Sequence, residues 1–161
     1  MPTKKRDQFI AAVQDAAAQP LDQSVLLSLV GYNCRRAFLN IMPLFEKRMV
    51  KYKLRAVDFS VLSLLKANPN INQKRLSQAV NVSPPNLAIL LDRLETRGLV
   101  MRQRSPLDKR SQTLILTPEG TSLCSKAEKT ASDLEIEATA MLSKTERNQL
   151  LKLLQKIYLQ D

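Results

Sequence analysis

Apolar residues recur at helical spacing over much of the chain. A stripe within residues 24–53 predicts one helix, and its members are Phe38, Ile41, Met42, Phe45 and Met49. Pro43 lies inside this stripe and lacks an N–H donor, so we expect it to kink or restart the helix near Met42. A compact apolar helix is predicted next, from Val57 to Ala67.

Two short helices joined by a tight turn are predicted in the middle of the chain. Asn72 is placed to cap a helix over residues 73–80, and Asn81 follows where a left-handed residue is favoured. Ser83 is then a suitable N-cap for a second helix from Pro84 to Arg97, which stops at Gly98. So short a connection between two helices is typical of a helix-turn-helix.

The second of these helices has two different faces. Four leucines recur at helical spacing and are predicted to face the core: Leu87, Leu90, Leu91 and Leu94. The remaining positions of the first turns point outward, where such motifs meet the major groove of DNA: Ser83, Pro84, Pro85, Asn86, Ala88 and Ile89. Asn86 can read adenine or bind phosphate, and Ser83 can cap the helix or contact DNA, so both roles stay open. Apolar contacts of Pro85, Ala88 or Ile89 with thymine methyl groups are the expected mode of base reading.

A β-hairpin with a basic tip is predicted between Leu99 and Gly120, where two apolar runs flank a Ser-Pro-Leu-Asp turn. The basic residues around this turn suit a phosphate-lined groove: Arg102, Arg104, Lys109 and Arg110. We interpret the hairpin as the wing of a winged-helix DNA-binding protein. Thr117 and Pro118 then begin a long helix through about Leu142, and residues 143–146 (Ser-Lys-Thr-Glu) form a capping box for a final helix.

Composition narrows the class of protein. The 161 residues include only three Gly, four Phe and three Tyr, with no Trp, which favours a mostly α (α+β) fold over a sandwich or barrel. Histidine is absent, and Cys34 and Cys124 have no metal-type spacing, so we expect no structural zinc, no cofactor and no His-dependent catalysis. No apolar stretch is long enough for a membrane span and no signal peptide is visible, so a cytoplasmic protein is expected.

The net charge of +10 is unevenly distributed. Residues 74–110 carry eight Lys and Arg against three Asp and Glu, and residues 24–55 carry seven against one. Residues 123–161 are balanced, with six of each sign. This distribution favours a polyanionic partner approached from one side, although solvated surface charge is the competing explanation.

The wing contains Asp108-Lys109-Arg110-Ser111 and a run from Leu114 to Gly120 at fixed spacing. With these residues, and with upstream matches over residues 76–83 and 91–100, the chain resembles the multiple-antibiotic-resistance regulator (MarR) family. The resemblance implies that Arg110 inserts into the minor groove of DNA and that Asp108 orients its guanidinium. An intramolecular Asp108–Arg110 pair that only stabilises the hairpin is the alternative. Lys109, Arg104 and Arg102 are expected to contact phosphates, with solvated charge as the competing account.

Three regions are predicted: dimerisation and effector-pocket helices over 1–53, a winged helix-turn-helix domain over 54–120, and C-terminal dimerisation helices over 121–161. The final helix has an apolar face without an obvious partner in its own domain: Leu150, Leu151, Leu154, Ile157 and Tyr158. Pairing with a second copy would bury this face and present two recognition helices to a pseudo-palindromic double-stranded DNA site. Folding back onto the wing domain of a monomer is the alternative.

Members of the resembled family commonly respond to a small phenolic or aromatic acid. In this chain the candidate effector residues are Tyr32, Arg35, Arg36 and Phe38, because a guanidinium can pair with a carboxylate and an aromatic ring can stack. Surface charge or phosphate contact is the competing role for the arginines. Cys34 lies beside Arg35 and Arg36 and raises a redox-sensing alternative, against which stands an inert, buried cysteine.

These observations favour a homodimeric, sequence-specific transcriptional regulator, a repressor released by a small ligand. A sequence-indifferent or architectural nucleic-acid-binding protein is the second hypothesis, because the same basic surface would serve it. An enzyme finds no support, since no nucleophile–base pair, carboxylate pair, phosphate loop or metal cluster is visible in the sequence.

Overall fold

The computed structural model describes residues 21–104 and 112–159, and these residues are mainly helical. The chain divides into two compact units, Met1–Phe38 and Leu39–Asp161. The predicted division at residues 53/54 and 120/121 stays a prediction. In chain order the elements are α2 (Ser24–Leu27), α3 (Val30–Met49), the 3-10 helix η1 (Val50–Tyr52), α4 (Ala56–Ala67), β1 (Ile71–Asn72), α5 (Gln73–Val80), α6 (Pro84–Thr96), β2 (Val100–Arg104), β3 (Gln112–Leu116), α7 (Pro118–Ala138) and α8 (Lys144–Tyr158).

Helix α3 contains Pro43 and continues through it, so the helix does not restart near Met42, while the kink that was the other expectation stays a prediction. The carbonyl that loses its partner to Pro43 belongs to Leu39, four residues earlier. Leu39 is exposed, so water can satisfy this carbonyl and the helix continues. The apolar stripe is buried only toward its C-terminal end, at Phe45 and Met49, whereas Phe38 remains exposed.

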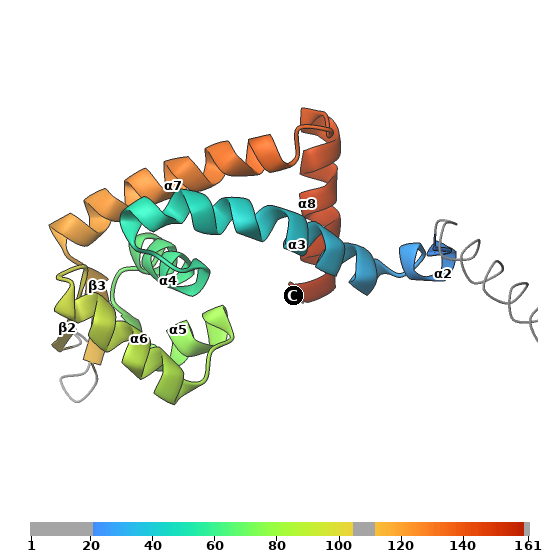
Figure 1. The fold of residues 1–161 in the computed structure, drawn as a ribbon. Coiled ribbons are helices and arrows are strands. Elements are labelled where there is room, and N and C mark those ends of the chain that lie inside the picture. Colours follow the sequence, from blue (N-terminus) through green and yellow to red (C-terminus); the bar gives the residue numbers. More distant parts are fainter. Residues whose placement is uncertain (1–20, 105–111, 160–161) are drawn as a thin grey trace, which may run out of the picture. The chain divides into compact units, whose positions relative to one another are not determined.

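Helix α4 is the centre of the larger unit. It contacts α7 on one side and α5 on the other, as Figure 1 shows. Its apolar residues Val61, Leu62 and Leu65 are almost completely buried, and they pack with leucines of α5 and α6 and with Met49 of α3. Burying each such side chain stabilises the fold by about 1.5–3 kcal/mol relative to exposure. This packing fixes the place of the two helices that follow.

A three-stranded antiparallel sheet completes the larger unit, with strand order β1-β3-β2. Strands β2 and β3 form the predicted hairpin, and Val100 pairs with Leu116 at its base. The sequence analysis missed β1, a two-residue strand in which Ile71 pairs with Leu114. Two residues carry too little periodicity to be recognised as a strand.

The start of α7 packs closely against the base of the hairpin. The Thr117 hydroxyl accepts a hydrogen bond from the Gly120 amide at 2.9 Å and donates to the Gly98 carbonyl at 2.6 Å, so the predicted cap is confirmed. A Cβ atom on Gly120 would lie 2.0 Å from the Leu99 carbonyl oxygen, which makes glycine necessary there. The helix ends at Ala138, four residues before the predicted end near Leu142, and a turn leads to Ser143.

Candidate nucleic-acid interface

The helix-turn-helix is built by α5, a short turn and α6. The Asn72 side chain accepts the Arg75 amide at 2.9 Å, and Asn81 ends α5 with a left-handed φ of 52°, as predicted. The Ser77 hydroxyl donates to the Val82 carbonyl at 2.6 Å and thereby holds the turn against α5. Ser77 itself is buried, so this hydrogen bond is protected from water and fixes the angle at which α6 leaves the turn.

Helix α6 buries one face and exposes the other. The four leucines predicted for the core are buried, and none is more than 6% exposed. Of the six residues predicted to point outward, Ala88 is half-buried and the others are exposed. Ile89 is 69% exposed. The helix therefore presents Asn86 and Ile89 on a face that its own unit does not use.

Ser83 occupies the N-cap position of α6, as predicted. Its side chain nevertheless makes no capping hydrogen bond. Pro84 and Pro85 occupy the first two positions of the helix and have no N–H to donate, so the serine has lost one of its two usual donors. Of the two roles considered for Ser83, the structure removes capping by hydrogen bond, while contact with DNA stays a prediction.

Arg102 of the wing is bound to α6, a contact that the sequence analysis did not foresee. Its guanidinium pairs with Asp92 at 2.6 Å and with Glu95, and its side chain is 24% exposed. The hydrogen bond with Asp92 is the main reason that the pKa of Arg102 rises further above its ordinary value. These contacts make Arg102 a brace between β2 and α6, and we no longer propose it as a phosphate ligand.

The rest of the predicted wing set divides into two groups. Arg104 is exposed at the end of β2, opposite Gln112 of β3. Asp108, Lys109 and Arg110 lie outside the described residues, so their predicted contacts with DNA stay predictions. The strands on both sides of the tip are in register, with Gln103 opposite Thr113.

A second unforeseen contact joins α4 to α6. Asp58, whose side chain is only 2% exposed, pairs with the Arg93 guanidinium, and its other oxygen accepts the Arg55 amide at 3.0 Å. The two paired residues are 35 positions apart, and an acidic residue in the first turn of a helix is ordinarily explained by the helix alone. No local sequence signal identifies such a pair.

The candidate effector residues lie on the first part of α3, within the smaller unit. Tyr32 donates its hydroxyl to Gln23 Oε1 at 3.0 Å, which ties α3 to the segment before α2. Arg35, Arg36 and Phe38 are exposed. Their side chains make no hydrogen bond or ion pair with any other described residue of the chain, so the structure leaves them accessible to a ligand.

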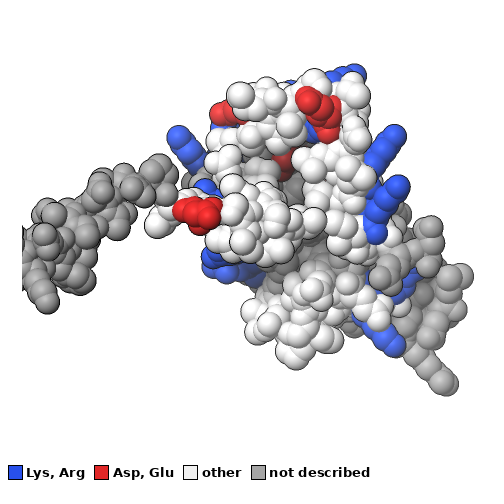
Figure 2. Space-filling view, turned by 90° about the vertical axis from the view of Figure 1, so that its right-hand side faces the viewer, with Lys and Arg blue, Asp and Glu red and all other residues white. Residues whose placement is uncertain are grey.

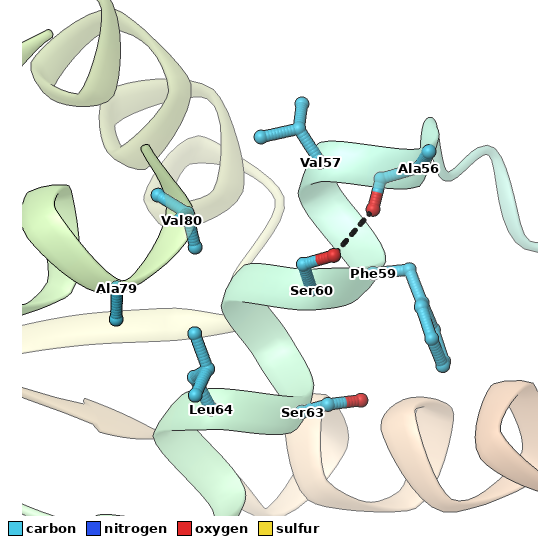
Figure 3. A pocket seen from close by; sticks show the side chains of 8 residues that line it. All are labelled: Ala56, Val57, Phe59, Ser60, Ser63, Leu64, Ala79 and Val80. Carbon is cyan, nitrogen blue, oxygen red and sulfur yellow. Dashed lines mark hydrogen bonds between the residues drawn. The ribbon is translucent and has the colours of Figure 1, made fainter. Parts of the chain in front are cut away.

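A cavity of about 600 Å³ lies between α4 and α5 in the larger unit. Figure 3 shows Val57 and Leu64 of α4 on the side of Ala79 and Val80 of α5, while Phe59 projects from the other side of its helix. The Ser60 hydroxyl is already donated to the Ala56 carbonyl at 3.1 Å. The cavity is lined without any charged side chain, so it offers no ion-pair partner to a carboxylate.

The two cysteines have different surroundings. Cys34 is exposed, which corrects the expectation of an inert, buried residue at this position. Cys124 is buried against Ser63, and burial raises the pKa of its thiol to about 11. Cys124 is therefore protonated near neutral pH, and its thiol is a poor nucleophile.

Helix α8 has the apolar face that the sequence predicted, and no residue of α8 is buried. The capping box is confirmed, because Ser143 accepts the Glu146 amide and the Glu146 carboxylate accepts the Ser143 amide at 2.8 Å. The exposed members of the apolar face range from 42% to 67% exposure: Leu150, Leu151, Ile157 and Tyr158. Leu154 is half-buried. This face therefore does not fold back onto the rest of its unit.

Three further observations concern surface charge, metal ligands and membrane-spanning helices. On the face drawn in Figure 2, Lys and Arg side chains project as separate groups. Within residues 21–104 and 112–159, no group of three or more His, Cys, Asp or Glu side chains is placed to hold a metal ion. Among the described helices, none is both long enough and apolar enough to cross a membrane.

Comparison with known proteins gives consistent matches. The sequence model of the MarR family matches residues 54–112. A relative from Thauera aromatica, named as a transcriptional regulatory protein for the hcr operon, is 31% identical over 103 residues, which is 64% of this chain and 62% of that protein. The chain thus covers less than two thirds of this relative's length.

Solved structures agree over a longer span. The transcriptional repressor CouR bound to a 23-mer DNA duplex is 36% identical with a TM-score of 0.80, covering 86% of this chain and 99% of that one. CouR bound to p-coumaroyl-CoA is 35% identical with a TM-score of 0.73, covering 86% and 97%. BpsR of Bordetella bronchiseptica, whose DNA binding is regulated by 6-hydroxynicotinic acid, is 25% identical with a TM-score of 0.75, covering 89% and 100%.

Proposed function

The chain is a member of the MarR family of transcriptional regulators, and from this premise we propose that it is a dimeric, sequence-specific repressor that an aromatic ligand releases from DNA. The family and the structural neighbours are regulators and not enzymes, which agrees with the absence of catalytic motifs in the sequence. The proposal therefore concerns binding free energies and no chemical step.

One observation carries the proposal, namely the division of α6 into a buried leucine face and an exposed face. The exposed face presents Asn86 and Ile89 beside two prolines, and the likeness to a repressor bound to a DNA duplex supports a groove as its partner. An asparagine suits adenine, and the Ile89 side chain suits a thymine methyl group. Each good contact of this kind discriminates against a wrong base by about 1–3 kcal/mol.

The wing supplies a second contact in this proposal. Arg110 enters the minor groove, where a narrow A·T-rich segment concentrates negative potential, and Asp108 orients the guanidinium. Arg104 and Lys109 contact phosphates on either side. An Arg110→Ala variant tests the wing, because it is expected to weaken DNA binding without changing the unfolding midpoint. Unchanged affinity would remove the wing from the mechanism.

A second copy of the chain is proposed to cover the apolar face of α8. The apolar face of α8 exposes leucines, Ile157 and Tyr158. Leaving this apolar face in water is unfavourable, so a partner surface is expected to cover it. Two-fold pairing presents two copies of α6 about one helical turn of DNA apart, so the operator is expected to be an inverted repeat.

The effector is proposed to carry an aromatic ring and an acid or acyl group, as p-coumaroyl-CoA and 6-hydroxynicotinic acid do in the neighbours. In this chain Tyr32 and Phe38 supply rings, while Arg35 and Arg36 supply positive charge for a carboxylate or phosphate. In one conformation of the dimer the two α6 helices have the spacing that the operator requires, and in another they do not. A ligand that binds more tightly to the second conformation lowers DNA affinity, by the difference between its binding free energies for the two conformations.

The test is selection from sheared genomic DNA at near-physiological salt, followed by sequencing of the bound fragments. An enriched inverted repeat supports a dimeric regulator, and release of that fragment by p-coumarate, p-coumaroyl-CoA or 6-hydroxynicotinic acid supports the effector class. Retention without enrichment, fading uniformly as salt rises, would favour the sequence-indifferent alternative.

A further inference from the structure

A cluster of basic side chains lies beside the C-terminal half of α6 and includes no residue assigned to DNA so far. It surrounds a pocket of about 250 Å³ lined by Lys53, Arg55, Asp58, Arg93 and Arg97. Four of these five side chains are cationic. The single carboxylate, Asp58, is buried and paired with Arg93, so it offsets the charge of that arginine and leaves three cations in excess.

Two of the four cations are used within the protein. Arg93 is paired with Asp58, as described above. Arg97 donates one N–H to the Lys53 carbonyl at 2.8 Å and another to the Tyr52 carbonyl at 2.9 Å. These bonds attach the segment before α4 to α6, and they fix the positions from which the remaining two cations project.

Lys53 and Arg55 are the two cations whose charge is not used in this way. Both are exposed, and neither side chain has a hydrogen bond or ion pair with any other described residue. Lys53 is held in a left-handed conformation, with a φ of 53°, which is uncommon for a lysine. Such backbone persists only where the surroundings hold it, and here the Arg97 hydrogen bond to the Lys53 carbonyl does so.

The cluster adjoins the face of α6 assigned to the DNA groove. A neighbouring hollow of about 300 Å³ is lined by Arg55 and Arg93 together with Asn86 and Ile89. Arg55 therefore lies beside the exposed face of α6, and a cation next to a helix that occupies the major groove is placed to meet the phosphates that border the groove.

We propose that Lys53 and Arg55 bind a phosphodiester of the DNA backbone at the edge of the groove that α6 occupies. This inference rests on the proposed function, and it adds a contact from the segment between η1 and α4. Asp58, Arg93 and Arg97 are positioning residues, because they hold this segment on α6 without meeting the phosphate. This contact sets how deeply α6 enters the major groove, because the bound phosphate has a fixed place on the DNA backbone.

The experiment measures DNA affinity as a function of salt for the full chain, using one duplex selected from genomic DNA. Each lost phosphate contact lowers the slope of log K against log salt by about 0.9. Arg55→Gln is expected to lower the magnitude of this slope by that amount and to weaken DNA binding about fivefold at 0.15 M salt. The double variant, Lys53→Gln with Arg55→Gln, is expected to lower the slope by about twice as much and to weaken binding about 30-fold. Lys129→Gln, at an exposed site on α7, is the charge-matched control and keeps the wild-type slope.

The results separate the two proposals. Suppose that the wild type binds the selected duplex and that the double variant keeps the wild-type salt slope, or that Lys129→Gln loses as much slope as the double variant. Either outcome overturns the phosphate contact and leaves the proposed function standing. No binding of any duplex by the wild type overturns both. Saturable binding of pyrophosphate that the double variant loses, with an unchanged DNA slope, assigns the cluster to a free anion and also overturns the proposal.

Discussion

Replacing Asp58 with alanine tests the connection between α4 and α6. The carboxylate is 2% exposed, pairs with Arg93 and accepts the Arg55 amide at 3.0 Å. Alanine removes both interactions at once. The Arg55 amide then loses its partner at the start of α4, and Arg93 loses the group that holds it against the core.

The magnitude follows from the two interactions. Loss of a side-chain acceptor at a helix N-terminus costs about 1 kcal/mol. A hydrogen bond to a charged group contributes about 1.5–3 kcal/mol, and the lower end applies here because Arg93 is 39% exposed and water can solvate it. Part of this loss is offset, since the variant no longer buries a carboxylate. We expect the free energy of unfolding to fall by about 2 kcal/mol.

Urea unfolding followed by circular dichroism measures this change. All variants are compared at one protomer concentration, because the apparent stability of a protein that dimerises, as proposed for this chain, depends on concentration. Asp133→Ala is the matched control, since Asp133 is 64% exposed and forms an i,i+4 pair with Lys129 on α7. The control is expected to change stability by no more than about 0.5 kcal/mol. An Asp58→Ala variant as stable as this control would refute the reasoning.

Three further predictions test other parts of the structure. Gly120→Ala is expected to destabilise the fold by about 3 kcal/mol or more in urea unfolding, because its Cβ would lie 2.0 Å from the Leu99 carbonyl oxygen; a loss below about 1 kcal/mol would contradict this packing. A Cys34→Ser variant leaves Cys124 as the single thiol, which is buried and has a pKa raised to about 11. This thiol is expected to react with a disulfide reagent at pH 7 only after the protein unfolds, and rapid labelling of the native protein would contradict that expectation. Leu151→Glu is expected to convert dimers into monomers in sedimentation experiments while helix content is retained, and a stable dimer would place the interface elsewhere.

The starts of three helices and the wing strands were predictable because their signals are local. Asn72, Ser143 and Thr117 cap helices in the structure as their spacing predicts, and the leucines of α6 are buried as their periodicity predicts. Each of these assignments depends on residues within one or two turns of one another.

Contacts between distant elements were not predictable in the same way. The pairing of Asp58 with Arg93 and the bracing of Arg102 by Asp92 and Glu95 depend on how helices and strands pack, not on spacing along one element. Arg102 was expected to contact phosphate, but its guanidinium pairs with Asp92 and Glu95 of α6. Ser83 makes no capping hydrogen bond, and Pro85 removes one of the two backbone N–H groups that such a serine ordinarily accepts.

The most direct test of the central account is a comparison of two duplexes of equal length and base composition. One carries the inverted repeat recovered by selection, and the other carries the same bases in scrambled order. At near-physiological salt the account predicts a dissociation constant at least about 10³-fold lower for the inverted repeat, as specific regulators show. Equal dissociation constants would contradict sequence reading by α6 and would leave only a general affinity for DNA.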